Sequence, residues 1–157
     1  MHAAAEAPGF ISNLTDRERS SRYVCSWSDS VGGTPMATQK TSAARCPPAL
    51  AASKPQQFAE LVLAGKQLAG LFGVVVGSDR EGGRLTKGDV IASALVALGT
   101  PTFPVMVGDR RHDVLGAAEH RVPSIGVLWG YGEPGELEQA GAAALAATPV
   151  ELVDLLT

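Results

Sequence analysis

The sequence predicts an α/β protein built around a parallel β-sheet. From residue 49 onward, short apolar runs alternate with amphipathic runs, the pattern typical of strands that are connected by crossover helices. The 157 residues fit one domain. Hydrophobic residues make up 45% and charged residues 18% of the chain, which is the composition of a globular protein. We therefore expect three layers, with helices covering both faces of the sheet.

The predicted strands are short and apolar on both faces, as buried parallel strands are. Residues 72–77 (FGVVVG) and 103–107 (FPVMV) each end at or next to a glycine, and residues 124–129 (SIGVLW) form a third run of this kind. A weaker edge strand is predicted over residues 142–147, where alanines would also suit a helix.

The predicted helices lie between these runs and start at recognisable caps. Ser53 is the expected N-cap of the first helix, with Pro55 in its first turn. Thr86 is the expected start of the second helix, and Thr148 with Pro149 the start of the last. Two shorter helices are predicted over residues 113–120 and 134–140.

The first 48 residues have a different character. Serine, threonine, arginine and glycine are scattered there without a period, and the cluster of Phe10, Ile11 and Leu14 is a poor strand candidate. We interpret residues 1–48 as an irregular segment and residues 49–157 as a partial core domain. One hypothesis is that the first segment is out-of-frame or fused sequence, which translation of the upstream DNA in the other frames would test.

Charge and apolar patterning exclude several classes of function. With a net charge of −3 and no basic stripe, the chain is not expected to bind nucleic acid. No apolar run approaches the ~20 residues that span a bilayer, and residues 1–10 lack the features of a secretory signal. Cys25 and Cys46 form neither a CxxC pair nor a disulfide framework, so we expect free thiols in the cytoplasm. No G-x-G-x-x-G follows a strand, which disfavours dinucleotide binding.

Two carboxylates follow the predicted strand over residues 103–107. Asp109 and Asp113 are four residues apart at the transition from this strand into a helix, so both can converge on one point. Parallel sheets bind ligands at the carboxyl ends of their strands. Mg²⁺ prefers such hard oxygen ligands. The alternative interpretation is that both aspartates serve only as turn and capping residues.

Three basic or hydroxyl side chains lie at comparable positions. Ser53 and Lys54 stand where a strand would turn into a helix, which suits an anion site, although capping alone would also explain them. Lys87 stands at the start of its helix, where the helix dipole disfavours a cation. A bound anion would explain that lysine, and an ordinary solvated side chain is the alternative.

Two further features are interpreted without a role in chemistry. His112 and His120 do not have the spacing of metal ligands and are expected at the surface. Residues 130–132 (GYG) follow a predicted strand; they could line a substrate site, but an ordinary turn is the favoured interpretation.

Taken together, these segments resemble the haloacid dehalogenase superfamily of phosphatases, specifically its phosphoglycolate phosphatase-like branch, over roughly residues 49–157. The resemblance implies a Rossmann-like sheet. Four segments carry it: residues 51–55 (AASKP), the stretch 77–91 with its TKGDVI, residues 105–114 (VMVGDRRHDV) and residues 125–132 (IGVLWGYG).

The resemblance also implies a chemistry. Members of this family attack a phosphomonoester with an aspartate, and water then hydrolyses the aspartyl-phosphate, with Mg²⁺ offsetting the charge. By this resemblance Asp109 would bind Mg²⁺ directly, and Asp113 would act through water or by orienting Lys87. Lys87 would neutralise the nucleophile and phosphate, while the backbone N–H of Ser53 and the side chain of Lys54 would hold phosphate oxygens.

The family's first motif, a DxDGT segment after a buried strand, is not found in residues 1–48. Asp16 has a second acid two residues later, at Glu18, and is the candidate nucleophile, although it follows a feeble strand. Asp29 lacks both a preceding predicted strand and a second acid at this spacing. Ala52 stands where the family has a hydroxyl group for the phosphate, and a cap domain is missing too.

The missing motif has a structural consequence. In this family the first-motif strand lies between the second-motif and fourth-motif strands, so its loss would leave the sheet incomplete. Either those two strands pair with each other, or a segment of residues 1–48 fills the gap. An unfilled gap would leave backbone N–H and C=O groups without partners.

These observations lead to one expected function and one alternative. We expect a Mg²⁺-dependent phosphomonoester hydrolase of this superfamily, impaired by the absent nucleophile motif. Its substrate would be a small phosphorylated metabolite, phosphoglycolate or a nucleoside monophosphate. The alternative is a non-catalytic remnant that binds phosphate or a partner protein. No membrane or nucleic-acid partner is expected, and an incomplete sheet would favour a homo-oligomer.

Overall fold

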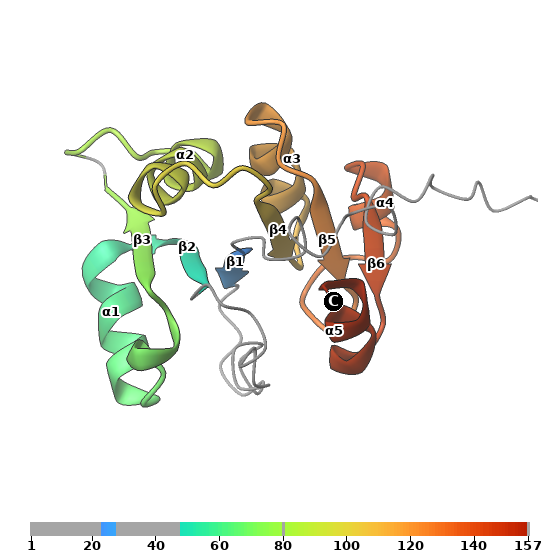
Figure 1. Ribbon diagram of the computed structural model, residues 1–157, viewed down its shortest axis with the longest axis horizontal. Helices are drawn as coiled ribbons and strands as arrows, with labels where there is room; N and C mark the ends of the chain where they lie inside the picture. Colours follow the sequence, from blue (N-terminus) through green and yellow to red (C-terminus); the bar gives the residue numbers. More distant parts are fainter. Residues whose placement is uncertain (1–22, 28–47, 80, 157) are drawn as a thin grey trace, which may run out of the picture.

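The computed structural model describes residues 23–27, 48–79 and 81–156, and it contains a six-stranded sheet in which every neighbouring pair is parallel (Figure 1). The strand order is β3-β2-β1-β4-β5-β6. The strands are β1 (Tyr23–Trp27), β2 (Ala49–Pro55), β3 (Val74–Ser78), β4 (Val105–Gly108), β5 (Ser124–Val127) and β6 (Ala144–Ala146). The predicted α/β class is confirmed.

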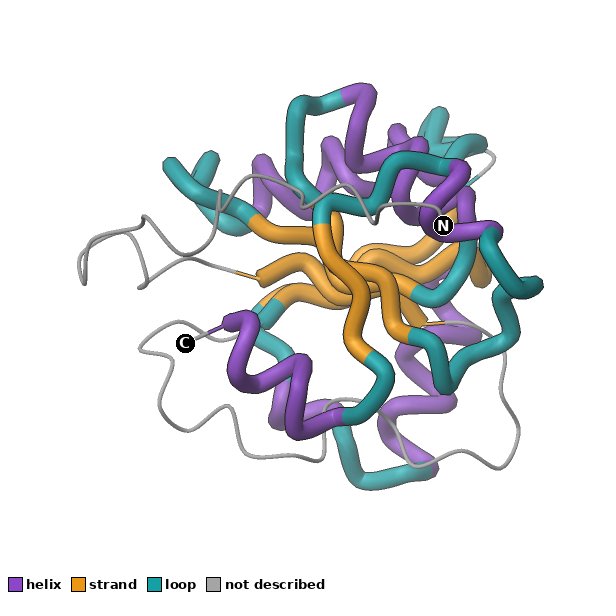
Figure 2. The backbone as a smooth tube through the Cα atoms, turned by 90° about the vertical axis from the view of Figure 1, so that its right-hand side faces the viewer, coloured by secondary structure: helices purple, strands orange, loops and turns teal. Residues whose placement is uncertain are grey.

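Helices cover both faces of this sheet, as Figures 1 and 2 show. In Figure 1, α2 and α3 lie above the strands, and α1 and α5 lie below them. The helices are α1 (Gln56–Gly65), the 3₁₀ turn η2 (Ala69–Leu71), α2 (Lys87–Ala97), α3 (Arg111–Glu119), α4 (Glu136–Gln139) and α5 (Pro149–Leu156). Within the described ranges, no helix has both the length and the apolar character needed to cross a membrane.

Residues 23–27 supply the central strand that sequence analysis did not find. β1 pairs in parallel with β2, where Val24 lies opposite Ala49, and with β4, where Cys25 lies opposite Val107. A segment of residues 1–48 therefore fills the gap in the sheet. Among the described strands, the edges of β2 and β4 that face each other are both paired with β1. An incomplete sheet thus no longer gives a reason to expect a homo-oligomer.

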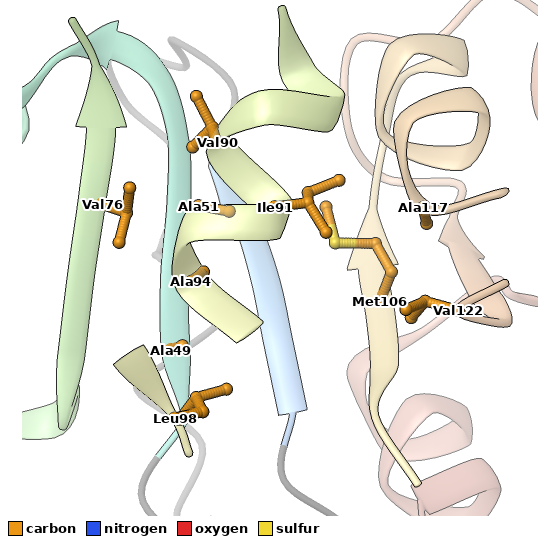
Figure 3. Close-up of a cluster of buried hydrophobic side chains, with 10 residues drawn as sticks. All are labelled: Ala49, Ala51, Val76, Val90, Ile91, Ala94, Leu98, Met106, Ala117 and Val122. Atoms are coloured by element: carbon orange, nitrogen blue, oxygen red, sulfur yellow. The ribbon is translucent and has the colours of Figure 1, made fainter. Parts of the chain in front are cut away.

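The core is divided between the two faces of the sheet because side chains of a strand alternate in direction. Ala49 and Ala51 of β2 pack with Met106 of β4 and with Ile91 of α2, as Figure 3 shows. On the opposite face, Leu50 and Ala52 pack against α1, and a separate cluster joins β4, β5 and β6 to α5. All of these clusters lie in layers between sheet and helices, which is the predicted three-layer arrangement.

The predicted caps were correct for two helices and wrong for one. Thr86 caps α2, since its hydroxyl accepts the Asp89 N–H at 3.1 Å, and Thr148 accepts the Glu151 N–H of α5 at 3.2 Å. Ser53 does not cap α1, because β2 continues through a bulge to Pro55, which is the N-cap residue and forms no side-chain cap hydrogen bond.

Candidate functional site

The strand order creates one place where a ligand crevice is expected. The chain builds the sheet outward in one direction from β1 through β2 to β3, and in the other direction from β4 through β5 to β6. In sheets of this kind, ligands bind outside the carboxyl ends of the strands at the point of reversal, here between β1 and β4. Asp109 directly follows the end of β4, so the sequence places a carboxylate at this point.

Asp109 is buried, with 5% of its surface exposed, and the loop after β5 surrounds it. The backbone N–H of Tyr131 donates a hydrogen bond to Asp109 Oδ2 at 2.9 Å. Gly130 packs so closely that a Cβ atom there would overlap the Cβ, Cγ and Oδ2 atoms of Asp109. A Cβ atom at Gly132 would lie 2.5 Å from the Asp109 carbonyl oxygen. This loop therefore fixes the position of the Asp109 carboxylate.

Asp113 forms a buried ion pair with Lys87. Lys87 Nζ lies 2.9 Å from Asp113 Oδ1, and both side chains are 5% exposed. The same ammonium donates a hydrogen bond to the carbonyl oxygen of Ala51 at 2.7 Å, and Asp113 Oδ2 accepts the Arg110 N–H at 3.2 Å. Since Ala51 is in β2 and Asp113 follows β4, Lys87 spans the position of β1 between them, level with Ser26.

The start of α2 is held firmly, which orients Lys87. Thr86 and Asp89 form a capping box, in which Asp89 Oδ2 accepts the Thr86 N–H at 2.8 Å and the Thr86 hydroxyl at 2.9 Å. The hydrogen bonds from Thr86 are the main reason why the pKa of Asp89 lies below its ordinary value. His120 at the end of α3 also contacts this turn, with Nε2 2.9 Å from the Gly88 carbonyl oxygen.

Glu136 connects the first turn of α3 to the start of α4. Its Oε1 accepts the Arg111 N–H at 2.7 Å and Arg110 Nε at 3.1 Å, while its Oε2 accepts the Glu133 N–H at 2.9 Å. The Arg111 N–H is the largest of the causes that lower the pKa of Glu136 from the ordinary 4.5 to about 2. The guanidinium of Arg110, in turn, has a raised pKa, chiefly because of its hydrogen bond to Glu136.

The side chains at the end of β4 fit a small divalent cation. Asp109, Asp113 and Lys87 together carry a net formal charge of −1, and the two carboxylates supply hard oxygen ligands. Among the described residues, no three His, Cys, Asp or Glu side chains form a group that could hold a metal ion. One or two carboxylates completed by substrate phosphate oxygens are the usual environment of Mg²⁺, rather than of zinc.

The other site residues predicted from the sequence are not among the contacts described above. Ser53 is exposed just beyond Ala51, the carbonyl of which accepts the Lys87 hydrogen bond. Lys54 is half-buried and lines a pocket on the α1 side of β2 together with Leu50, Ala52, Ala59 and Val62. Asp16 and Asp29 lie outside the described residues. Sequence analysis found no strand before Asp29; that was wrong, because β1 ends at Trp27.

Two parts of this site were not found from the sequence. The residues 130–132 were interpreted as an ordinary turn, but they hold Asp109; the glycine at each end of GYG was the available signal. Glu136 was not singled out, since nothing in a polar helical segment marks one glutamate as the acceptor of three hydrogen bonds. His112 and His120 are exposed, as predicted.

Comparison with known proteins agrees with this geometry. Residues 87–156, which contain Lys87, Asp109 and Asp113, match the family model described as HAD-hydrolase-like. Over residues 87–156 this chain matches the haloacid dehalogenase-like family. The solved structure of a predicted phosphatase from Clostridium acetobutylicum has a TM-score of 0.66 and 36% identity, over 76% of this chain and 55% of that one.

Two curated relatives of this chain carry other names. The tyrosine-protein kinase PtkA of Mycobacterium tuberculosis is 39% identical over 111 residues, which are 69% of this chain and 38% of PtkA. A solved structure of PtkA has a TM-score of 0.62 and 37% identity, over 77% of this chain and 56% of that one. A 5′-nucleotidase of Pseudomonas aeruginosa is 36% identical over 89 residues, which are 56% of this chain and 40% of the relative. The chain thus spans about two fifths of the length of these curated relatives.

Proposed function

We propose that this chain is a Mg²⁺-dependent phosphomonoester hydrolase of the haloacid dehalogenase-like family. The observation that carries the proposal is a buried Asp109 directly after β4, followed by Asp113 in a buried ion pair with Lys87. A phosphate with Mg²⁺ is the ligand that suits this combination of charges.

Each of these three residues has a proposed role. Asp109 would hold Mg²⁺ directly, and Asp113 would hold it through water or orient Lys87, with which it is paired at 2.9 Å. When bound, Mg²⁺ would neutralise phosphate oxygens and polarise the ester. The ammonium of Lys87 would stabilise the negative charge of nucleophile and phosphate. The backbone N–H of Ser53 and the side chain of Lys54 would hold the remaining phosphate oxygens.

Two aspartates are candidates for the nucleophile, Asp16 and Asp29. In the proposed reaction a carboxylate oxygen forms a bond to phosphorus while the bond from phosphorus to the ester oxygen breaks, and the departing alcohol takes up a proton. Water then cleaves the aspartyl-phosphate and releases inorganic phosphate. β1 points to Asp29, because Asp29 follows the end of this strand by two residues in the sequence.

The substrate that we propose is a small phosphorylated metabolite, phosphoglycolate or a nucleoside monophosphate. The similarity to a 5′-nucleotidase supports the nucleotide. We also propose a cytoplasmic location, where Cys25 and Cys46 would be free thiols. The similarity to a protein named tyrosine-protein kinase agrees with phosphoryl chemistry more broadly, since kinases and phosphatases both transfer a phosphoryl group.

A second candidate function is a non-catalytic phosphate- or partner-binding remnant. Ala52 favours it, because this buried residue of β2 provides a methyl group where the family has a hydroxyl for the phosphate. In that case, Lys87 and the two aspartates would still bind Mg²⁺ and phosphate, without turnover.

The test is p-nitrophenyl phosphate hydrolysis with and without Mg²⁺, combined with calorimetric titration of Mg²⁺ in the presence of beryllofluoride. We expect turnover that Asp109→Asn abolishes and that the matched control Asp154→Asn, an exposed position on α5, preserves. Asp16→Asn and Asp29→Asn identify the nucleophile, since only one should abolish turnover while Mg²⁺ binding remains. Mg²⁺ binding without turnover in the unmodified protein supports the remnant instead. Neither binding nor turnover would overturn both functions.

A further inference from the structure

The loop Leu128–Gly132, which follows β5, is tied to the proposed phosphoryl site. The Tyr131 N–H donates to Asp109 Oδ2 at 2.9 Å, and Gly130 and Gly132 leave no room for a side chain between the loop and Asp109. At its start, the Leu128 N–H donates to the Ala146 carbonyl oxygen at 3.0 Å. Both contacts are to buried residues, so the loop is attached to Asp109 by one hydrogen bond and to β6 by the other.

This loop presents three large apolar side chains to solvent within four positions. Leu128 is 52% exposed, Trp129 36% and Tyr131 56%. Large apolar side chains that are exposed close together often mark a binding site. Trp and Tyr are the side chains that most often supply such a surface, because a flat ring gives contact area and a polar group remains in water.

We propose that the Leu128–Gly132 loop is an aromatic platform that selects phosphomonoesters in which the alcohol carries a planar ring. This inference rests on the proposed function. Because the Tyr131 N–H holds Asp109, a substrate with its phosphoryl group at Asp109 would lie next to this loop, and the group attached to its ester oxygen would be the part that meets Trp129 and Tyr131. The shared ligand chemistry is a ring close to the phosphate, supplied either by a phenyl ester such as phosphotyrosine or by a nucleoside monophosphate.

The surroundings favour a ring over an anionic substrate such as phosphoglycolate. Aromatic faces carry partial negative charge, and the platform is followed by the acidic Glu133 and Glu136. The basic side chain of Arg110 is paired with Glu136 at 3.1 Å. A carboxylate at this position would therefore meet negative charge, whereas a ring could stack on the aromatic side chains.

The experiment compares kcat/KM for phosphotyrosine, adenosine monophosphate and phosphoglycolate, with Mg²⁺ present. We expect a ring-bearing substrate to be preferred over phosphoglycolate by at least tenfold. Trp129→Leu should lower kcat/KM for that substrate about tenfold and change the value for phosphoglycolate less than twofold, and Tyr131→Ala should lower the ratio of the two values about tenfold. Tyr131→Phe, which keeps the ring, should retain the preference. Phe58→Ala is the matched control, because it removes an aromatic side chain that is 60% exposed on α1.

The outcomes separate this inference from the function on which it rests. Phosphotyrosine as the preferred substrate assigns the platform to aryl esters, and adenosine monophosphate assigns it to nucleotides. Equal loss for all three substrates in Tyr131→Ala, or preference for phosphoglycolate, overturns the platform while the hydrolase stands. A binding measurement covers the case in which the chain has no turnover. Phenyl phosphate, but not inorganic phosphate, should quench the tryptophan fluorescence of the unmodified protein, and this quenching should disappear in Trp129→Leu. If phenyl phosphate does not quench the fluorescence of the unmodified protein, the platform is overturned too.

Discussion

Lys87 Nζ lies 2.9 Å from Asp113 Oδ1 in surroundings where only 5% of either side chain reaches solvent. Removing one member of such a buried pair leaves the other charge without its main partner, which costs about 3–5 kcal/mol. We therefore expect Lys87→Met to lower the free energy of unfolding by about that amount at neutral pH, as measured by urea denaturation.

A second variant separates the charge effect from the loss of packing. Lys87→Met combined with Asp113→Leu should recover a large part of the lost stability, because the remaining buried charge is gone. Lys66→Met, at an exposed lysine that follows α1, should change stability by less than about 0.5 kcal/mol. If Lys87→Met behaved like Lys66→Met, the ion pair would contribute nothing to folding.

Gly130 is expected to control Mg²⁺ binding without touching the ion. An alanine at this position must displace the Asp109 carboxylate or the loop that surrounds it, because its Cβ would overlap Asp109. We expect Gly130→Ala to weaken Mg²⁺ binding at least tenfold in calorimetric titration, in line with other groups that orient metal ligands. Circular dichroism should still show a folded α/β protein.

Gly65 offers the control for this substitution. It is the last residue of α1, and nothing lies within 4 Å of a Cβ built there. Gly65→Ala should leave Mg²⁺ affinity unchanged and should raise stability slightly, since alanine favours a helix over glycine. Unchanged Mg²⁺ affinity in Gly130→Ala would refute the positioning role of the loop.

Glu136 should make stability depend on acid pH. Its pKa is lowered from 4.5 to about 2 in the folded chain, first by the Arg111 N–H, then by the Glu133 N–H and by Arg110. The unfolded chain thus binds a proton at higher pH than the folded chain does, and protonation favours unfolding. The stabilisation from Glu136 is complete above about pH 4.5 and is lost as the pH falls toward 2.

Glu136→Gln should reduce this loss between pH 4.5 and 2 and should be less stable than the unmodified protein at neutral pH. The measurement is thermal unfolding across this range. Glu138→Gln, at an exposed glutamate of the same short helix, should keep the pH dependence of the unmodified protein. Identical pH profiles for Glu136→Gln and the unmodified protein would show that these hydrogen bonds do not favour the ionised carboxylate.

Thr86 should support both the helix and the lysine next to it. Thr86→Ala removes the hydroxyl of the capping box, which accepts the Asp89 N–H at 3.1 Å, and caps of this type contribute about 0.5–2 kcal/mol. We expect a loss of stability in this range by urea denaturation. Thr102→Ala, at an exposed loop residue, should be neutral. If both variants were equally stable, the cap would be dispensable.

Much of the fold could be predicted because several signals agree locally. The apolar runs that became β3, β4 and β5 are enriched in β-branched residues, and Thr86 and Thr148 mark helix starts by a mechanism that acts over three residues. Asp109 and Asp113 could be singled out for the same reason, since the strand before them and the helix after them are both clear. The spacing within one segment was sufficient in each case.

The parts that were missed depend on distant contacts. Tyr23–Trp27 (YVCSW) lacks the aliphatic run that marked β3, β4 and β5, and its role comes from pairing with β2 and β4 at residues far along the chain. Glu136 acts on Arg111, 25 positions earlier. Ser53 was assigned to a helix start because sequence alone does not show that β2 continues to Pro55 by pairing with Ser78 of β3. In all three cases, contacts between residues far apart in the sequence determine the structure.

Because β1 lies between two partners, its attachment uses the main chain on both sides, and almost any five-residue segment without proline could supply these peptide groups. The middle of the sheet is thus a slot in which backbone pairing on both sides holds the strand. A synthetic peptide covering Tyr23–Trp27, added to a version of the protein that begins at Pro48, would be expected to restore the architecture in trans, as in split-protein complementation.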